Sequence, residues 1–445
     1  MVLPKLTRKQ LQLIALALAL ALVLAAWLIS RFITPAPPRT ISMTSGALDG
    51  AAHQFGLKYQ SFLKANGVTL ELQTSNGSVQ NLERLNAGTP VGFVQGGLGV
   101  LTLDPSNTLE ETPLHSLAVI GYEPLWIFTH SPELAKQLSQ GLGAIAGKKI
   151  AIGGQGSGTR KVALELLQLY GIDDKKATLS TEGGTKAADM LIAKELDAVL
   201  MIVAPQGAAV QKLLNHGGIQ LVQIDHAEGL ARRLPYLSLV TLKASSVSPE
   251  RKLPPQDVTL LTTTANLVVR DDLHPALSYL LLEAAREIHQ SPSLLNRPGD
   301  FPHPRATDFP LAEESQRYFK DGRPFLQRYL PFWLANFVQR LLLILVPLLA
   351  IAIPVLKAIP GLFNFKEKNR LYRRYAVLLE MEGSLRKRQL SKDQLHATEL
   401  QLEQIEQDIS KTKFTLEFAD RVYTLRQHVD FVRGQIHKQQ ERPNT

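Results

Sequence analysis

Cysteine is absent from this chain. Its absence excludes disulfide bonds, and it also excludes zinc or iron–sulfur centres held by thiolates. Any folded domain must therefore be stabilised by the packing of its core. The 445 residues are enough for one large domain, or for two ordinary domains with additional tails.

The sequence also lacks a recognisable set of catalytic or metal-binding residues. Its histidines are scattered and do not have the spacing of metal ligands. Ser157 lies in Gly-Ser-Gly rather than in the Gly-x-Ser-x-Gly pattern of a nucleophilic serine. The acidic pairs 110–111 and 271–272 are typical of solvated turns. We therefore expect neither enzymatic activity nor a metal or other cofactor.

Acidic residues are in the minority, and the formal net charge is +9. Such an excess suggests nucleic-acid binding, but much of it lies next to two long apolar runs. Basic residues at the ends of membrane spans fix the orientation of a protein and contact anionic lipid. We therefore expect a membrane, and no nucleic acid, as the partner of these charges.

The two apolar runs cover residues 11–29 and 337–356. A helix of about 20 apolar residues crosses a bilayer. The first run contains no charge, whereas Arg340, Pro347 and Pro354 interrupt the second. A cleaved signal peptide is the alternative for the first run, and a buried helix of a soluble domain is the alternative for the second. The length of the first run and the basic cluster after the second favour two membrane helices.

Basic residues also predict the orientation. Lys5, Arg8 and Lys9 precede the first run, and six basic residues follow the second run between residues 357 and 374. Because basic residues beside membrane spans stay in the cytoplasm, we expect both termini there. The segment between the two runs is then expected outside a bacterial inner membrane.

Between residues 40 and 290, short β-rich runs alternate with amphipathic helical patterns, which predicts an α/β fold with mostly parallel sheets. The expected strands are 69–73, 91–95, 117–129, 149–153, 198–203, 221–224 and 258–270. The expected helices are 52–66, 79–87, 158–170, 185–194, 205–216 and 275–290.

One glycine-rich turn, residues 153–159 (Gly-Gly-Gln-Gly-Ser-Gly-Thr), connects an expected strand to an expected helix. Free amides at the start of a helix bind anions, and glycines let the backbone approach a ligand closely. The spacing fits neither a phosphate loop, which requires Gly-Lys-Ser/Thr, nor the dinucleotide fingerprint. The alternative is a helix cap whose glycines serve tight packing.

Further polar turns with glycine follow expected strands. They are residues 45–50 after a strand at 40–44, then 74–78, 95–97 and 181–185. In open α/β sheets such turns lie at the carboxyl ends of the strands, where ligands bind. Several of them in one domain predict a common cleft, although each one alone is also compatible with a capped turn.

Several of these segments resemble the TAXI class of solute receptors of TRAP transporters. The matching segments are 45–50, 74–81, 87–95 and, most specifically, 147–159, while 308–336 is similar to a membrane-anchored subgroup of this family. The resemblance implies a type II periplasmic binding fold, in which two lobes joined by two crossover strands close on a ligand. It further implies a small organic anion as ligand, a carboxylate such as glutamate or 2-oxoglutarate, and TRAP-type permease subunits as partners.

In this interpretation the ligand lies between the lobes. Backbone amides of the 156–159 turn hold a carboxylate, and side chains of the other turns donate hydrogen bonds to it. The expected ligand-binding residues are Ser45, Gly46, Asp49, Ser75, Asn76, Gly77, Gln95, Gly156, Ser157, Gly158, Thr159, Gly184 and Thr185.

The C-terminal tail combines charged with aliphatic residues. Leu395, Leu402, Ile409 and Leu416 repeat every seven residues, whereas the apolar residues from 422 to 436 follow a shifted register. This shift predicts two helices, which form a hairpin or a coiled coil. The pair either packs on itself or binds a helical partner.

Together these features predict a membrane-tethered solute-binding protein that serves uptake. A membrane sensor or scaffold, which uses the same binding fold and signals through the cytoplasmic tail, is the alternative. The expected organisation is a cytoplasmic N-terminus (1–10), a membrane helix (11–30), a proline-rich linker (31–39), a two-lobed TAXI-like domain (40–297), a juxtamembrane linker (298–336), a second membrane helix (337–359) and a cytoplasmic helical tail (360–445).

Overall fold

The structure is a computed structural model that describes Ala19, Val23, Trp27 and residues 35–99, 113–305, 308–387, 390–412 and 418–441. Residues 351, 355–367 and 370 are described by their backbone only. The chain forms two compact units. One is Pro35–Gln339, and the other combines Met1–Thr34 with Arg340–Thr445.

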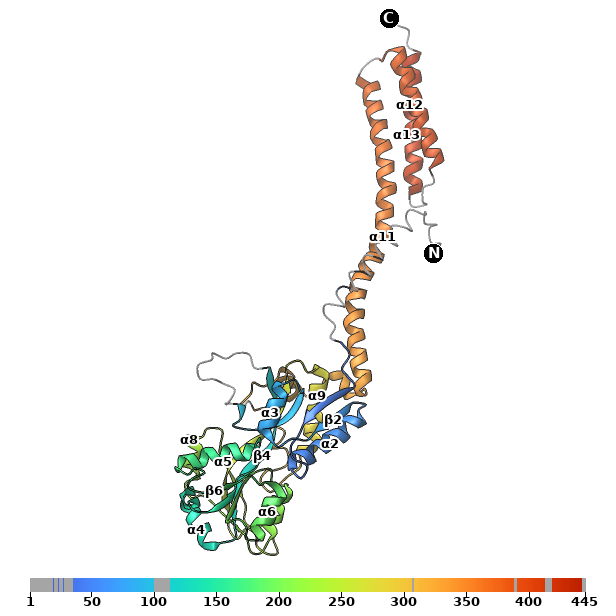
Figure 1. Cartoon of the computed structure of the whole chain (residues 1–445). Coiled ribbons are helices and arrows are strands. Elements are labelled where there is room, and N and C mark those ends of the chain that lie inside the picture. The colour runs from blue at the N-terminus through green and yellow to red at the C-terminus, as the bar shows by residue number, and fades with distance from the viewer. Residues whose placement is uncertain are drawn as a thin grey trace. The chain divides into compact units, whose positions relative to one another are not determined.

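The unit Pro35–Gln339 is built on one ten-stranded sheet in the order β2-β1-β3-β10-β4-β7-β5-β6, with β8 beside β4 and β9 beside β10 (Figure 1). The strands are β1 (Thr40–Thr44), β2 (Thr69–Gln73), β3 (Val91–Gln95), β4 (Leu114–Thr129), β5 (Lys149–Ala151), β6 (Thr178–Ser180), β7 (Ala198–Ile202), β8 (Gln220–Leu221), β9 (Ser238–Leu242) and β10 (Val258–Arg270). The helices are α2 (Ala51–Ala65), α3 (Ser78–Asn86), α4 (Pro132–Gln140), η2 (Leu142–Ile145), α5 (Gly158–Leu169), α6 (Gly184–Ile192), α7 (Ala208–Asn215), α8 (Ala227–Arg233), α9 (Pro275–His289), α10 (Glu313–Asp321) and η3 (Phe325–Arg328).

The sheet is mixed. β1 pairs in parallel with β2 and β3, and β5 pairs in parallel with β6 and β7. The pairs that β4 and β10 make with β3, β7, β8, β9 and with each other are antiparallel. The expectation of mostly parallel sheets was therefore wrong for the centre of the sheet, because two long strands run against their neighbours there.

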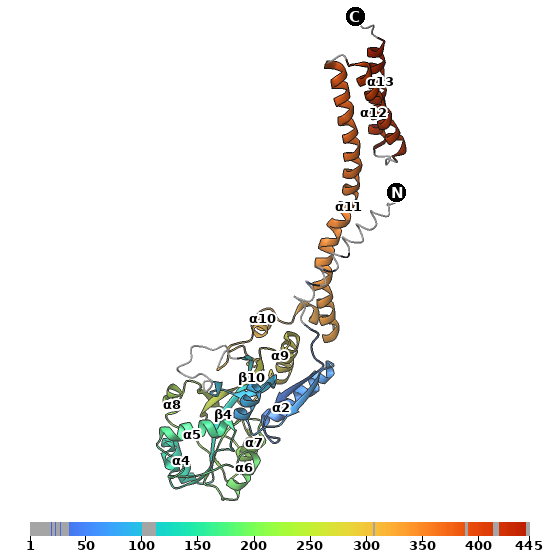
Figure 2. The same cartoon turned by 45° about the horizontal axis from the view of Figure 1, so that its top comes forward.

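These long strands, β4 and β10, divide the unit into two lobes (Figure 2). In the first lobe, residues 265–269 of β10 pair with β3; in the second lobe, residues 258–262 pair with β9. β4 likewise pairs with β7 and β8 through its last residues. Both strands therefore cross from one lobe to the other near Gly121 and Thr263. This is a periplasmic-binding-protein-like α/β fold, in which hinge motion at such crossings closes the lobes on a ligand.

In the first lobe, alternate side chains of the strands pack against helices on opposite faces of the sheet. Phe93 and Leu267 pack in the core beneath α2 and α9, whereas the adjacent Val94 and Val268 pack with Leu85 of α3 on the other face. Successive side chains of a strand point to opposite faces. The nearly continuous apolar strands of this region are therefore explained by helices on both sides.

The second lobe follows the same rule. All five residues of β7 are buried, and their side chains belong to two different cores. Leu200 packs with Val162 and Leu166 of α5, whereas Val199 packs with Ala188 of α6 on the opposite face. The amphipathic helices predicted from the sequence therefore supply the layers that bury this strand.

α11 (Phe332–Lys387) begins in the first unit and continues into the second. Its stretch Phe332–Pro354 has a mean hydropathy of 2.2. Phe332, Ala335 and Asn336 at its start are buried, whereas the described side chains from Phe337 to Pro354 are exposed or partly exposed. Within the part of the chain that the structure describes, this is the one helix long and apolar enough to cross a membrane. The expected first membrane helix, 11–30, lies outside the described residues apart from Ala19, Val23 and Trp27.

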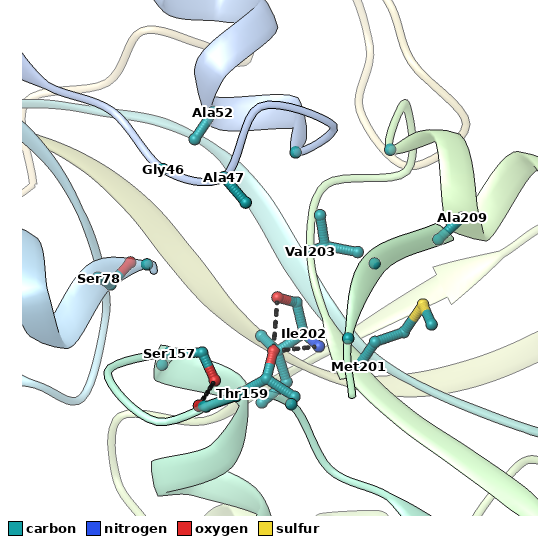
Figure 3. Close-up of a pocket in the computed structure, with 18 of the residues that line it drawn as sticks. Gly46, Ala47, Ala52, Ser78, Ser157, Thr159, Met201, Ile202, Val203 and Ala209 are labelled. Atoms are coloured by element: carbon teal, nitrogen blue, oxygen red, sulfur yellow. Dashed lines mark hydrogen bonds between the residues drawn. The ribbon is translucent and has the colours of Figure 1, made fainter. Parts of the chain in front are cut away.

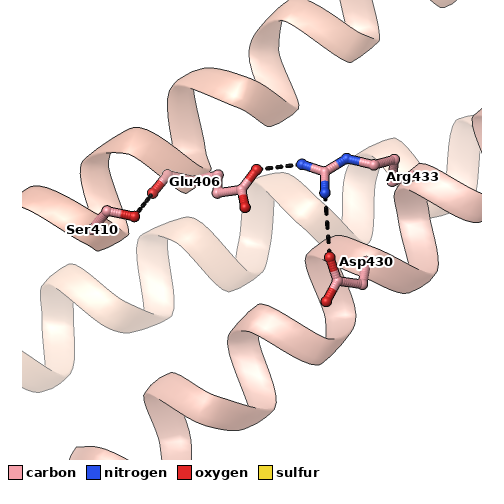
Figure 4. A network of polar contacts seen from close by, with 4 residues as sticks. All are labelled: Glu406, Ser410, Asp430 and Arg433. Carbon is pink, nitrogen blue, oxygen red and sulfur yellow. Dashed lines mark hydrogen bonds and ion pairs between the residues drawn. The ribbon is translucent and has the colours of Figure 1, made fainter.

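The end of the chain forms a small helical core of its own. α12 (Lys392–Lys411) and α13 (Ala419–Gln440) pack against the last part of α11, with Leu378, Leu402 and Val429 buried between them. The expected pair of helices is therefore part of a three-helix arrangement. Arg433 of α13 forms ion pairs with Glu406 of α12 and Asp430 on its own helix (Figure 4).

Candidate functional site

A cavity of about 590 Å³ lies between the two lobes. Ligand sites typically have volumes of this size. Figure 3 shows Ala47 and Ala52 of the first lobe on one side, and Ser157 and Thr159 of the second lobe on the other. The residues of the lining come from the turns that follow β1, β2, β3, β5 and β7, so the cavity lies at the carboxyl ends of the strands, as the sequence pattern predicts.

Most of the residues that the sequence pattern selects meet at this cavity. Ser75, Gly156 and Thr185 do not line it. The others do: Ser45, Gly46, Asp49, Asn76, Gly77, Gln95, Ser157, Gly158, Thr159 and Gly184.

The hydroxyl groups of the glycine-rich turn are already used within the protein. Ser157 is the N-cap of α5: its Oγ accepts from the Arg160 amide at 3.2 Å and donates to the Gly154 carbonyl at 2.8 Å. Thr159 Oγ1 accepts from the Ile202 amide at 3.0 Å and donates to the Ile202 carbonyl at 3.2 Å (Figure 3). The single O–H donor of each hydroxyl is therefore used within the protein. Ser157 caps α5, and Thr159 fixes the start of α5 to β7.

Hydroxyls of the first lobe have similar structural roles. Ser45 Oγ donates to the Gln73 carbonyl at 3.1 Å and lies 3.0 Å from His53 Nδ1. Ser75 Oγ donates to Asn81 Oδ1 at 2.5 Å. These bonds hold the turns after β1 and β2, so the sequence-based role of Ser45 and Ser75 as ligand donors is not supported by their geometry.

Asn81 is the residue that sequence reasoning missed. It is 1% exposed, and its Nδ2 donates to the carbonyls of Ser45 and Phe93 at 2.9 and 2.8 Å. Its Oδ1 accepts from Thr44 as well as from Ser75. One amide therefore ties three turns of the cavity together. The only signal in the sequence is an asparagine on the apolar face of a helix.

The two lobes also contact each other directly. The Asp49 carboxylate, from the turn before α2, accepts from the Thr185 amide at 3.0 Å and from Thr185 Oγ1 at 2.9 Å. The bond from the Thr185 amide is the main reason why the pKa of Asp49 is lowered. In return, the Gly156 carbonyl of the second lobe accepts from the Val79 and Gln80 amides at 3.1 and 3.2 Å.

Each lobe thus satisfies free amides at the start of a helix in the other lobe, α6 in one case and α3 in the other. The contact is close at Gly77, where an added Cβ would lie 2.9 Å from Ser157 Cα. Gly77 also has a φ of 133°, which side chains rarely adopt. The structure is therefore a closed form in which Asp49, Thr185 and Gly156 serve lobe contact.

Gln95 is a polar side chain that stays available. It is 3% exposed, lines the cavity, and its Nε2 has no hydrogen-bond partner among the described residues. The Gln95 amide packs against Gly158, where an added Cβ would lie 2.5 Å from Gln95 Oε1. The amides of Gly158 and Thr159 lie at the start of α5, where the first amides of a helix have no partner within it. An acceptor group of a ligand can bind here.

The ionisable side chains that line the cavity are acidic. Asp49 and Glu123 are the charged side chains among the described residues that line it. Burial raises the pKa of Glu123 to about 8. Glu123 belongs to β4 close to the point where this strand changes lobe.

The two lobes and the cavity between them define a binding-protein-like unit, and comparison with protein families agrees. The chain belongs to the NMT1-like family, which it matches over residues 55–321. A search of curated proteins found no match.

Solved structures with a similar arrangement are remote. The periplasmic aliphatic sulphonate binding protein SsuA from Escherichia coli is 14% identical with a TM-score of 0.35, and the match covers 57% of this chain and 73% of that one. The periplasmic binding protein BugD is 15% identical with a TM-score of 0.38, covering 57% and 84%. The BenM effector binding domain with benzoate is 15% identical with a TM-score of 0.35, covering 60% and 100%.

Proposed function

We propose that this protein binds a small organic solute between its lobes and delivers it for uptake, without catalysing a reaction on it. The observation that carries the proposal is the cavity of about 590 Å³ at the crossing strands, lined by an unpaired buried donor, Gln95 Nε2, and by the start of α5. Buried polar groups are normally paired. A polar ligand atom is the partner that this geometry leaves room for.

We also propose that the binding unit lies outside the cytoplasm and is tethered to a bacterial inner membrane. The apolar stretch Phe332–Pro354, whose described side chains from Phe337 onward are exposed or partly exposed, supports one membrane helix. The uncharged run 11–29 supports the other. Basic residues before the first and after the second favour cytoplasmic termini.

The resemblance to TAXI receptors adds finer expectations to this proposal. A carboxylate of the solute would accept from Gln95 Nε2 and from the Gly158 and Thr159 amides. TRAP-type permease subunits would then take over the solute.

The tail favours a second candidate, a membrane sensor or scaffold with the same binding unit. Simple delivery of a solute does not require the three-helix core around Leu378, Leu402 and Val429. Deletion of residues 366–445 separates the two candidates. Uptake that survives the deletion supports delivery, and loss of the cellular function with unchanged solute affinity supports signalling.

The binding proposal is tested with the full-length protein in detergent and Gly158→Ala. The added methyl group displaces the Gln95 amide, so thermal stabilisation by any binding solute should be lost. Gly143→Ala is the matched control, because no atom lies within 4 Å of its added Cβ. Equal stabilisation of both variants by the same solute would contradict binding at this cavity.

A further inference from the structure

Glu123 occupies a position that the hydrogen bonds of the protein do not explain. It lies in β4 opposite Thr263 of β10, where the two crossing strands pass between the lobes. Its side chain lines the cavity of about 590 Å³ and also a second cavity of about 260 Å³ on the side of α2 and α9. In the described part of the chain, its carboxyl group makes no hydrogen bond or ion pair.

The main cavity offers Glu123 no cationic side chain, because none of the described residues that line it is a lysine, arginine or histidine. In the second cavity, Lys58 is exposed and its Nζ lies over the Phe55 ring at 5.7 Å. His289 lines that cavity too, but burial, and to a lesser extent the charge of Lys58, lowers its pKa to about 3, so it is neutral. Tyr122, which precedes Glu123 in β4, also lines that cavity.

The remaining charge does not compensate Glu123 either. Asp49 is acidic, and its carboxylate is engaged by Thr185 across the lobes. Glu123 is half-buried, and a carboxylate that loses part of its water without gaining a partner is less favourable in its charged form. This burial raises the pKa of Glu123 to about 8. The protein therefore holds an acid at the crossing strands that a ligand group, rather than a protein group, must satisfy.

We propose that the solute carries a protonated amine that binds the Glu123 carboxylate, so that the cleft selects aminated solutes over purely anionic ones. This inference rests on the proposed function, since it assigns a chemical class to the solute of the same cavity. An ammonium group donates charge-assisted hydrogen bonds to a carboxylate, and such bonds are strongest where water is excluded. A solute with only acceptor groups can accept one hydrogen bond from protonated Glu123, but it cannot form the charge-assisted pair with the carboxylate.

The two protein groups that would bind the solute, Gln95 for its acceptor end and Glu123 for its amine end, lie at different places in the cavity. Gln95 pairs with Ala265 of β10 on one side, whereas Glu123 pairs on the other side with Thr263, two residues before Ala265. A solute that spans this distance can bind both groups at once. Its amine then contacts the strands that move during closure, which couples recognition to the hinge.

The test uses matched pairs of probes that differ in the amine. These are putrescine with 1,4-butanediol, 4-aminobutyrate with 4-hydroxybutyrate, and glutamate with 2-oxoglutarate. Calorimetry is done on the full-length protein, on Glu123→Gln and on the control Glu71→Gln, whose exposed carboxylate lies on β2 away from both cavities. We expect the aminated member of at least one pair to bind at least tenfold more tightly. This preference should vanish in Glu123→Gln and persist in Glu71→Gln.

The pH dependence of the unmodified protein is an independent readout. Below pH 8 an ammonium group must displace the proton of Glu123, so its affinity should rise by about tenfold per pH unit between pH 6 and 8. Affinity independent of pH in this range would overturn the inference.

The outcomes also separate this inference from the proposed function. Equal or tighter binding of the amine-free members, if abolished by Gly158→Ala, would overturn the role of Glu123 and leave solute binding intact. No binding by either member of any pair would count against both.

Discussion

Asp49 should control how firmly the lobes stay closed. Asp49→Ala removes two hydrogen bonds that join the lobes, at 3.0 and 2.9 Å to Thr185. A hydrogen bond to a charged group contributes about 1.5–3 kcal/mol. Because Asp49 is exposed, screening by solvent reduces this to about 1–2 kcal/mol for the pair. The ratio of closed to open protein should fall about 5- to 30-fold.

Asp257→Ala is the matched control. Its carboxylate accepts from one backbone amide, Ala244 at 2.9 Å, and from one side chain, Lys243 at 2.8 Å, but all three residues belong to the second lobe. Each substitution removes one bond from a backbone amide and one from a side chain, which is a hydroxyl for Asp49 and an ammonium for Asp257, and only the bonds of Asp49 cross the cleft.

The assay is the distance between spin labels at Lys64→Cys on α2 and Gln137→Cys on α4. The chain contains no cysteine, so labels attach at these exposed positions alone. Asp49→Ala should shift the distance distribution toward the open form and Asp257→Ala should not. An unchanged distribution in Asp49→Ala, or an equal shift in both, would refute the role of Asp49. The pKa of Asp49 is lowered, so its contribution should be present above its ordinary pKa and lost as pH falls through the lowered value.

Thr159→Val should lower the free energy of unfolding by about 1–3 kcal/mol, because the Ile202 amide and carbonyl lose their partner, whereas Thr159→Ser should not; chemical denaturation measures both. In the unmodified protein, the free energy of unfolding should fall by at most about 1.4 kcal/mol per pH unit as pH rises from the ordinary glutamate pKa to about 8, because folding raises the pKa of Glu123. This fall should be absent in Glu123→Gln. Thermal unfolding across pH measures both proteins, and a stability difference between them that does not change with pH would contradict the prediction. Leu378→Ala should destabilise the helical core of the tail by about 2–5 kcal/mol and leave solute affinity unchanged. Reporter fusions after Thr445 and near Gly218 should be cytoplasmic and external, respectively; an external signal at Thr445 would contradict two membrane helices.

Periodic patterns were sufficient for the framework of the binding unit. β2, β3 and β10 have the bounds expected from the sequence, and the starts of α5 and α9 were also correct. These elements have strong apolar periodicity and clear boundaries, such as Ser157 at an N-cap and Pro275 at a first helical position. The edge strands β6 and β9 were missed; β6 has only three residues, and most residues of β9 are exposed or half-buried, so neither has a clear apolar pattern.

The site was less predictable than the fold. Sequence position correctly brought Gln95, Ser157 and Gly158 to one cavity, because turns after neighbouring strands share an edge. It did not show which polar groups stay free. The Thr159 hydroxyl is hydrogen-bonded to the Ile202 backbone, and this could be seen only once the two segments are packed together in the structure. Asn81 was missed for the same reason, since its three-way bonding depends on residues far away in the chain.

The tail shows a further limit of local patterns. Leu371, Leu378 and Leu385 repeat every seven residues and extend the helical core into α11. The sequence analysis assigned these residues to the cytoplasmic tail, but it recognised helical repeats only from Leu395 onward. It therefore predicted two helices in the tail and missed the third, which is the continuation of α11.

The central claim is that a solute binds between the lobes at the start of α5. Native mass spectrometry of the full-length protein released from detergent tests it most directly. The unmodified protein and Gly143→Ala should retain the same small organic mass, and Gly158→Ala, in which a methyl group meets the Gln95 amide, should not. Retention of the same solute by all three proteins would contradict the account.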